Sequence, residues 1–181
     1  MAITRLGPNQ SVNLASNVTG TLPAANGGTG ATSFTAGKVL QVQSTLNGND
    51  FSTTSASFTD VTGMSLTITP SATSSKILLL CNTNTYQNTN QAYWAMRWER
   101  AISGGATTTF GNSTYGQSFA RSAQDHDFWG GVGMTYLDSP STTSEITYQV
   151  QASTTGSGTI NISVNSTNQN NIIALEIAGW L

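Results

Sequence analysis

The sequence predicts an all-β protein, an antiparallel β-sandwich of the jelly-roll type preceded by an extended N-terminal arm. Apolar residues alternate with Thr, Ser or Asn in several short segments, which is the period-two pattern of half-buried strands. Glycine, proline and polar residues separate these segments at spacings typical of a sandwich. No segment shows the periodicity of an amphipathic helix.

Three parts are expected along the chain. Residues 1–21 hold isolated apolar residues that alternate strictly only at Val12 and Leu14, so this arm cannot bury a core of its own. Residues 22–37 are rich in glycine, which permits positive φ, and form a connector. Residues 38–181 are long enough for one core-bearing domain, the sandwich.

The clearest strand of the sandwich is expected over residues 64–69. Met64, Leu66 and Ile68 fall on one face of it, hydroxyl side chains fall on the other, and Pro70 ends it.

Residues 145–150 and 159–165 repeat this alternation on either side of a glycine-containing turn. The sequence therefore predicts that they form an antiparallel hairpin. The residues expected to face inward are Ile146, Tyr148, Val150, Ile160, Ile162 and Val164.

Two other segments are apolar on both faces over part of their length, residues 77–81 and 172–177. Such strands sit centrally in a sheet or have one face covered by a neighbouring subunit. Residues 92–102 and 128–137 are expected to be aromatic-rich strands.

Composition excludes several classes of function. The chain has six basic and eight acidic residues among 181, and the basic ones are scattered, so we expect no nucleic-acid partner. The longest aliphatic run, residues 77–81, is too short for membrane insertion. Cys81 is the only cysteine, so no intrachain disulfide forms, and we expect folding in a reducing cytoplasm without a signal peptide.

His126, the only histidine, lies between Asp125 and Asp127. In an extended segment these two carboxylates point to opposite faces and do not converge on a metal ion. No G-x-S-x-G elbow supplies a nucleophile for it. We interpret the cluster as a polar loop and expect no metal, no cofactor and no catalytic site.

Glycoside hydrolysis requires two carboxylates at a defined separation. The acids that could supply such a pair are dispersed and share no signature: Glu99, Asp138, Glu145 and Glu176. We therefore expect the protein not to be an enzyme.

Aromatic residues are the best candidates for a ligand surface, because exposed rings stack on sugar rings. Tyr86, Tyr115 and Trp129 lie near glycine or polar loops and are the candidate receptor contacts. Aromatic residues on strands are more often buried. Those expected in the core are Trp98, Phe110 and Tyr136.

Residues 22–33, LPAANGGTGATS, are very similar to a segment that recurs in bacteriophage tail fibres and related virion proteins ahead of a distal β-rich domain. Four downstream segments resemble that distal domain in marine phages, so that the resemblance covers most of residues 22–150. They are GKVLQV (37–42), FSTTS (51–55), LTITPS (66–71) and YLDSP (136–140).

The resemblance implies a non-enzymatic structural protein of the virion surface, made in the bacterial host cytoplasm. It implies a homotrimer, which agrees with strands that have little charge to protect their edges. The leading interpretation is a short tail fibre or spike whose loops meet a host cell-surface glycan or protein. The alternative is a head fibre or capsid decoration (cement) protein.

In both interpretations the arm attaches the protein to other virion proteins. The apolar residues expected to make this contact are Ile3, Leu6, Val12 and Leu14. A cell-surface carbohydrate-binding sandwich and a polysaccharide depolymerase are the rival classes, and both fit less well. The first lacks a signal peptide, and the second usually needs a much longer chain.

Overall fold

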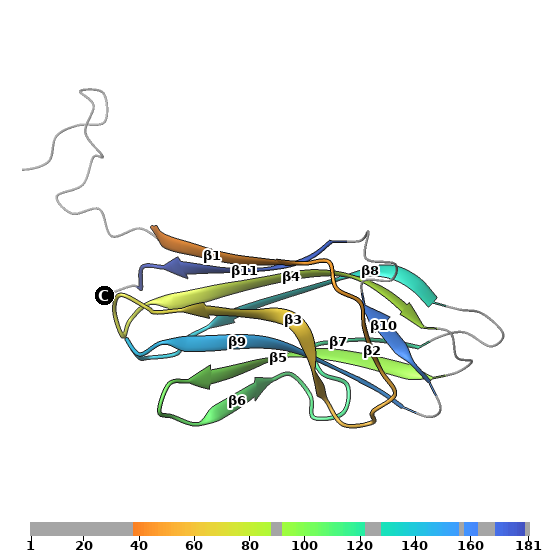
Figure 1. Ribbon diagram of the computed structural model, residues 1–181. Coiled ribbons are helices and arrows are strands. Elements are labelled where there is room, and N and C mark those ends of the chain that lie inside the picture. The colour runs from red at the N-terminus through yellow and green to blue at the C-terminus, as the bar shows by residue number, and fades with distance from the viewer. Residues whose placement is uncertain (1–37, 88–91, 122–127, 156–157, 163–168, 180–181) are drawn as a thin grey trace, which may run out of the picture. The chain divides into compact units, whose positions relative to one another are not determined.

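Two antiparallel β-sheets pack face to face in the computed structural model (Figure 1). The structure describes residues 38–87, 92–121, 128–155, 158–162 and 169–179, and the statements below concern these residues. The predicted arm and connector lie outside them. The described part of the chain contains no helix, and so none long and apolar enough to cross a membrane.

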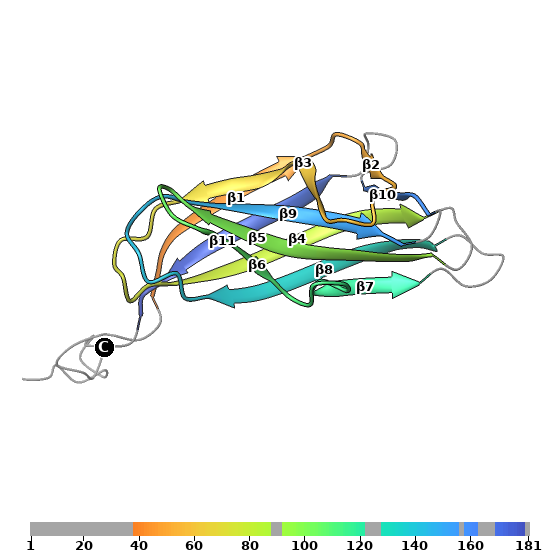
Figure 2. The ribbon, with the colours of Figure 1, turned by 90° about the horizontal axis from the view of Figure 1, so that it is seen from below.

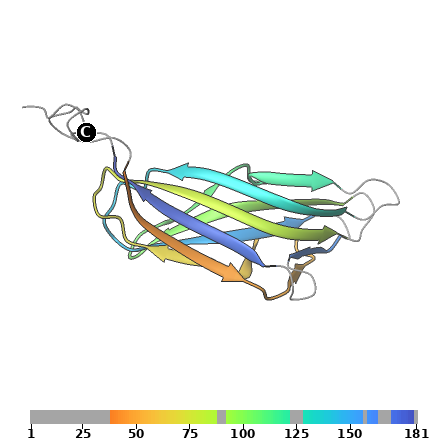
Figure 3. The same cartoon turned by 90° about the horizontal axis from the view of Figure 1, so that it is seen from above.

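Sheet A has six strands and sheet B has five, and every strand pair is antiparallel. Sheet A contains β1 (Val39–Asn47), β2 (Phe51–Thr53), β4 (Lys76–Gln87), β8 (Phe128–Asp138), β10 (Ile160–Ile162) and β11 (Asn170–Ile177). Sheet B contains β3 (Thr59–Ile68), β5 (Tyr93–Ile102), β6 (Thr107–Phe110), β7 (Ser118–Arg121) and β9 (Ile146–Thr154). Figure 2 shows the molecule from the side of sheet B, and Figure 3 from the side of sheet A.

Several short strands lie end to end along one neighbour. β10 and β11 both pair with β4, and β6 and β7 both pair with β5. On the other side, β2 pairs with β10 and β1 pairs with β11. Joined in this way, each sheet has four strands. Sheet A runs β1/β2, β11/β10, β4, β8, and sheet B runs β3, β9, β5, β6/β7. The first strand thus pairs with the last and the others nest inside, which is the jelly-roll arrangement that the sequence predicted.

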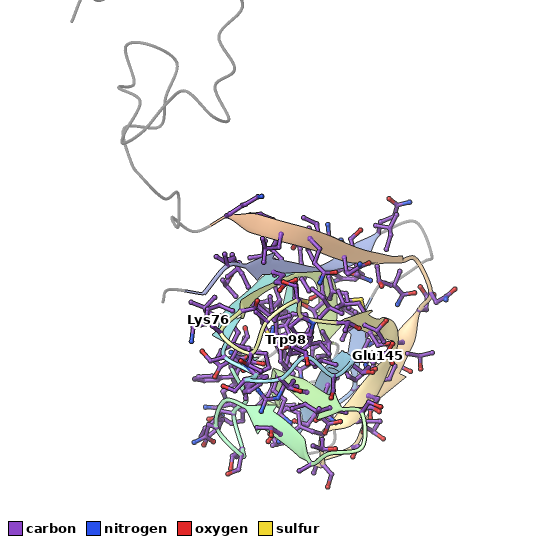
Figure 4. The ribbon with its side chains drawn as sticks, turned by 90° about the vertical axis from the view of Figure 1, so that its left-hand side faces the viewer. Lys76, Trp98 and Glu145 are labelled. Atoms are coloured by element: carbon purple, nitrogen blue, oxygen red, sulfur yellow. The ribbon has the colours of Figure 1, made fainter. Side chains whose placement is uncertain are left out.

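Alternation of side chains explains which residues face the core. Met64, Leu66 and Ile68 of β3 are buried, as are Ile146, Tyr148 and Val150 of β9, which confirms the predicted inward faces. Ile160 and Ile162 of β10 are also buried. Figure 4 looks from the end at which β4 begins and shows Trp98 of β5 between the two sheets.

The predicted hairpin of residues 145–150 and 159–165 is wrong. β9 pairs with β3 and β5 in sheet B, whereas β10 pairs with β2 and β4 in sheet A. The backbone N–H of Thr155 still donates to the carbonyl of Tyr93 (2.8 Å), so the chain follows β5 until it leaves sheet B. Alternation alone does not distinguish a hairpin from a connection between sheets, because both strands bury one face in either case.

The two segments that are apolar on both faces occupy central positions. β4 lies between β8 and β11, and β11 lies between β4 and β1. The inner residues Ile77, Leu79 and Cys81 of β4 are buried. Burial raises the pKa of the Cys81 thiol to about 12, so this cysteine stays protonated and inert.

Glu176, on the inner face of β11, is 1% exposed and accepts four hydrogen bonds. Its Oε1 accepts from the backbone N–H (2.7 Å) and hydroxyl (2.6 Å) of Ser71 and from the hydroxyl of Ser75 (2.6 Å). Its Oε2 accepts from the side-chain amide of Gln41 (2.6 Å). Burial alone raises the pKa of Glu176, but these hydrogen bonds outweigh it and hold the pKa below its ordinary value.

Asp138, at the end of β8, connects the two sheets. Its carboxylate accepts two hydrogen bonds from Arg100 Nη1 of β5 (2.8 and 2.9 Å) and one from the Tyr148 hydroxyl of β9 (2.6 Å). Burial and the hydrogen bond to Asp138 raise the pKa of Tyr148, so its hydroxyl remains a donor. A buried ion pair of this kind orients its partners even where its net contribution to stability is small.

The Glu176 cluster predicts an acid-sensitive contribution to stability. Because the pKa of Glu176 is lowered in the folded state, its contribution is complete above the ordinary value of 4.5 and is lost as the pH falls through the folded pKa. Glu176→Gln should lower the free energy of unfolding at pH 7 by about 2 kcal/mol and weaken its loss at low pH. Urea unfolding between pH 7 and pH 3 measures both, with exposed Glu145→Gln as the control. If the Glu176→Gln variant lost as much unfolding free energy between pH 7 and pH 3 as the unmodified protein, Glu176 would not be the source of the acid sensitivity.

Asp138 generates a second prediction. Asp138→Asn should lower the free energy of unfolding by about 2 kcal/mol, because it leaves the partly buried Arg100 guanidinium without its counter-charge. The double variant Asp138→Asn/Arg100→Met removes both charges, and its loss should be smaller than the sum of the losses in the single variants Asp138→Asn and Arg100→Met. Denaturant unfolding of the two single variants and the double variant measures this coupling. Additive losses would show that the two side chains do not act as a pair.

Candidate functional site

No group of three or more His, Cys, Asp or Glu side chains within the described ranges is placed to hold a metal ion. Two of the acids considered for glycoside hydrolysis, Asp138 and Glu176, are instead buried in structural hydrogen-bond networks. Glu99 accepts a hydrogen bond from Gln151 (3.0 Å), and Glu145 is exposed. The cluster of residues 125–127 lies outside the described residues.

One shallow hollow lies beside β2 and β10. It is lined by Asp50, Phe51, Ser52, Asn161 and Ile162 and has a volume of about 130 Å³. Ligand pockets commonly have volumes of about 300–1,000 Å³, so this hollow is too small to enclose a sugar unit or cofactor. This hollow therefore carries no candidate ligand site.

Three aromatic rings and an arginine form a cluster on the outer face of sheet B, which we call the aromatic surface: Tyr93, Tyr115, Phe119 and Arg121. Tyr115 lies 6.3 Å from Tyr93 and 5.2 Å from Phe119 between ring centroids. The guanidinium of Arg121 lies 5.0 Å from the centre of the Tyr93 ring. Tyr115 is 45% exposed and Phe119 is 57% exposed, so both rings are accessible.

A tight turn presents Tyr115. The side-chain oxygen of Asn112 accepts from the backbone N–H groups of Thr114 (2.8 Å) and Tyr115 (3.0 Å). Gly116 closes the turn at φ +60°, and a Cβ there would lie 2.3 Å from the carbonyl oxygen of Met96. Only glycine fits this position, so the turn holds the Tyr115 backbone in place.

The chemistry of the aromatic surface suits a saccharide. The faces of the rings can stack on the C–H face of a sugar. The guanidinium of Arg121 offers several fixed donors to hydroxyl or carboxylate oxygens. A second arginine of this sheet, Arg97, lies 4.0 Å from the centre of the Phe58 ring.

The three predicted receptor residues do not gather in one place. Tyr115 lies on the outer face of sheet B, whereas Tyr86 and Trp129 pair across β4 and β8 on the outer face of sheet A. The Tyr86 and Trp129 rings stack with centroids 3.9 Å apart. Trp129 is 61% exposed, and Tyr86 is half-buried beneath it.

The core predictions for aromatic residues hold for Trp98 and Phe110, which are both buried. Tyr136 is partly buried and stacks on Phe110 with centroids 4.3 Å apart. Sequence reasoning missed the exposure of Phe119 and the place of Arg121 beside Tyr93. Both follow from the pairing of β7 with β5, which the sequence did not show.

The outer face of sheet A carries a group of aliphatic side chains, which we call the apolar face. Sequence reasoning missed the part of it on β1 and β8, although it did notice that residues 77–81 and 172–177 are apolar on both faces. The apolar face consists of Val39, Val42, Leu46, Leu78, Leu80, Leu137, Ile173, Leu175 and Ile177.

The chain enters the sandwich at one end, and four of its strands end at the opposite one. β1 begins beside the end of β11, the start of β4 and the end of β8. The ends of β2, β4, β7 and β9 lie at the opposite end of the sandwich, which is the right-hand side of Figure 1. The arm and connector therefore join the sandwich at one end, and four strand connections leave from the other.

No protein-family model matches the chain, and no curated protein matches it significantly. Solved structures of infectious bursal disease virus show a distant similarity. The Gx strain structure has a TM-score of 0.39 at 11% identity and covers 76% of this chain and 37% of that one. The Gt strain structure has a TM-score of 0.35 at 10% identity and covers 98% and 44%.

The crystal structure of the VP2 subviral particle of the same virus has a TM-score of 0.33 at 12% identity, and covers 78% of this chain and 40% of that one. The chain thus spans less than half the length of the virus proteins that it matches. Similarities this distant identify neither a family nor a function.

Proposed function

We propose that this chain is a non-enzymatic structural protein of a bacteriophage virion surface, a short tail fibre or spike that displays its sandwich as a homotrimer. The observation that carries the proposal is the separation of the two ends of the sandwich. The chain enters β1 at one end, after a segment that resembles the hinge of phage fibres. Arg121 and Tyr93 of the aromatic surface pair at the opposite end, and the proposal assigns that end to the host cell.

The chemistry of the described residues agrees with a structural role. Two carboxylates considered for catalysis are buried in hydrogen-bond networks, and the hollow beside β2 is too small for a substrate. Jelly rolls occur in viral capsid proteins and lectins, so this fold suits both particle building and glycan binding. Because one fold serves many functions, the hinge resemblance and the arrangement of the ends support the proposal more than the fold does.

One observation favours the alternative, a head fibre or capsid decoration protein. β1 begins at Val39, directly after the connector of residues 22–37, so no shaft separates the connector from the sandwich. A sandwich joined to its arm by a short connector in the sequence suits a protein that lies on a capsid. The same arm residues would make the attachment in either case.

Deletion of residues 1–21 tests the anchoring role. The shortened protein should keep the β-sheet circular dichroism spectrum of the full chain and should no longer be incorporated into particles. Quantitative mass spectrometry of purified virions measures incorporation, and a cryo-electron microscopy map of the unmodified virion distinguishes tail from head. Unchanged incorporation of the shortened protein would refute the arm as anchor, and absence of the full chain from virions would refute the proposal itself.

The aromatic surface is the proposed receptor contact. The double variant Tyr115→Ala/Phe119→Ala should reduce virion adsorption to host cells about tenfold, because it removes two exposed stacking rings. Both rings are accessible, so the fold should be retained. Thr67→Ala, at an exposed position of sheet B outside the aromatic surface, is the control. Trp129→Ala tests the other predicted contact, and a larger loss in that variant would move the receptor contact to sheet A. Unchanged adsorption in both aromatic variants would exclude both aromatic groups.

A further inference from the structure

The apolar face of sheet A is continuous across four strands. The strand registers place outward-facing aliphatic side chains of neighbouring strands directly beside one another. One such row is Leu137, Leu78, Leu175 and Val42. Val42 is 54% exposed, Leu137 is 55% exposed and Leu46 is 61% exposed, so this face meets solvent in the isolated chain.

The apolar face lacks charge. Among the outward-facing residues that the structure describes on β1, β4, β8 and β11, only Lys76 is charged, and it lies at the border with its ammonium group on the Ser139 hydroxyl (2.8 Å). Contiguous aliphatic surface of this kind marks an interaction site, because soluble monomers rarely expose it.

The outer face of sheet B provides the internal comparison. Gln151 of β9 bonds to Asp60 (2.8 Å), to Glu99 (3.0 Å) and to Arg97 (2.8 Å), so charged and amide groups cover this face. Thr67 of β3 is exposed there as well. The two sheets share one core but differ on their outer faces, so the apolar character of sheet A is not a general property of the chain.

Two glycines of β8 have no role within the described fold. Gly131 and Gly133 are exposed on the outer face of sheet A, and neither has a positive φ. A Cβ at Gly131 would come only within 3.9 Å of a backbone oxygen, and one at Gly133 within 3.8 Å, which are ordinary contacts. Glycine within a strand lowers its stability and often marks the close approach of another backbone.

The length and composition of the edge strands also favour sheet A as the sheet that associates with another chain. β8 is 11 residues long, contains no Lys, Arg or Pro, and pairs only with β4 among the described strands. On sheet B, β6 and β7 have four residues each. The side chains of Thr45 and Asn47 on β1 bond to carbonyls of β3 and close that side of the sandwich (2.9 Å each). A long edge without outward-facing charge, such as β8, invites pairing with another chain.

We propose that the apolar face of sheet A, with Gly131 and Gly133, is the surface through which copies of this chain associate. The partner must be apolar, uncharged and able to bring its backbone close, and sheet A of further copies meets these conditions. In a trimer the three apolar faces meet around the threefold axis, so that each face contacts both of its neighbours. Four strands about 4.8 Å apart and a β4 about 40 Å long cover roughly 700 Å², close to the ~800 Å² per partner of a standard interface. This inference deepens the homotrimer of the proposed function by naming its contact surface.

Sedimentation equilibrium of the purified full-length chain tests the proposal at micromolar concentrations. The unmodified protein should sediment as an oligomer. Leu137→Lys and Gly131→Val should each raise the dissociation constant about a hundredfold, because one introduces a charge and the other a larger side chain where the copies pack closely. Thr67→Lys is the matched control on sheet B and should keep the mass of the unmodified protein.

Circular dichroism separates loss of association from loss of folding. Gly131→Val should keep the β-sheet spectrum, because Gly131 is exposed, a Cβ there makes only an ordinary contact (3.9 Å), and β-branched residues favour strands. Hydrogen exchange of the unmodified protein gives a measurement that needs no variant. The amides of β8 that do not pair with β4 should exchange slowly, whereas the outer amides of β6 and β7 should exchange fast.

A monomer in the unmodified protein would overturn the proposal. The proposal would also be overturned if Leu137→Lys and Gly131→Val kept the oligomer mass, or if the edge amides of β8 exchanged as fast as those of β6 and β7. A mass of three chains also agrees with the homotrimer, and any other oligomer lost in the face variants supports the contact surface while contradicting the trimer. These results are independent of whether the chain is found on virions.

Discussion

Burial of the inner faces of the two sheets is the interaction on which the rest of the structure depends. Trp94 and Trp98 of sheet B are almost completely buried, and Leu79 and Ile172 face them from sheet A. Because both sheets must exclude water on the same side, every strand is committed to one inward set of alternate residues. This commitment determines which side chains remain on the two outer faces.

The core tolerates two inner carboxylates because each is fully occupied. Glu176 ties β11 to β1 and to the segment before β4, and Asp138 ties β8 to β5 and β9. Buried carboxylates without such partners are strongly unfavourable. With only 14 charged residues in the chain (six basic and eight acidic), two placed in the interior leave few to cover the surface. The surface charge that does occur gathers on sheet B, and sheet A is left with its apolar face.

This division of the surface links the fold to the proposed role. A virion surface protein has to contact its own copies or its particle on one side and its target on another. Sheet A offers aliphatic side chains, a long edge without outward-facing charge and two glycines. Sheet B offers Tyr115, presented by a turn that requires Gly116, together with Phe119 and Arg121 of β7. The two outer faces are thus chemically suited to different partners.

The sequence by itself determined the fold class and the inward face of most strands, because alternation and residue type are local properties. Met64, Leu66 and Ile68 could be assigned to the core without any structure. Only the tertiary structure decided which strands are neighbours. It placed β9 and β10 in different sheets, separated Tyr115 from Trp129, and brought Leu78, Leu137 and Val42 together on one face. Strand pairing depends on contacts between residues far apart in the chain, and alternation is the same whichever strand lies alongside.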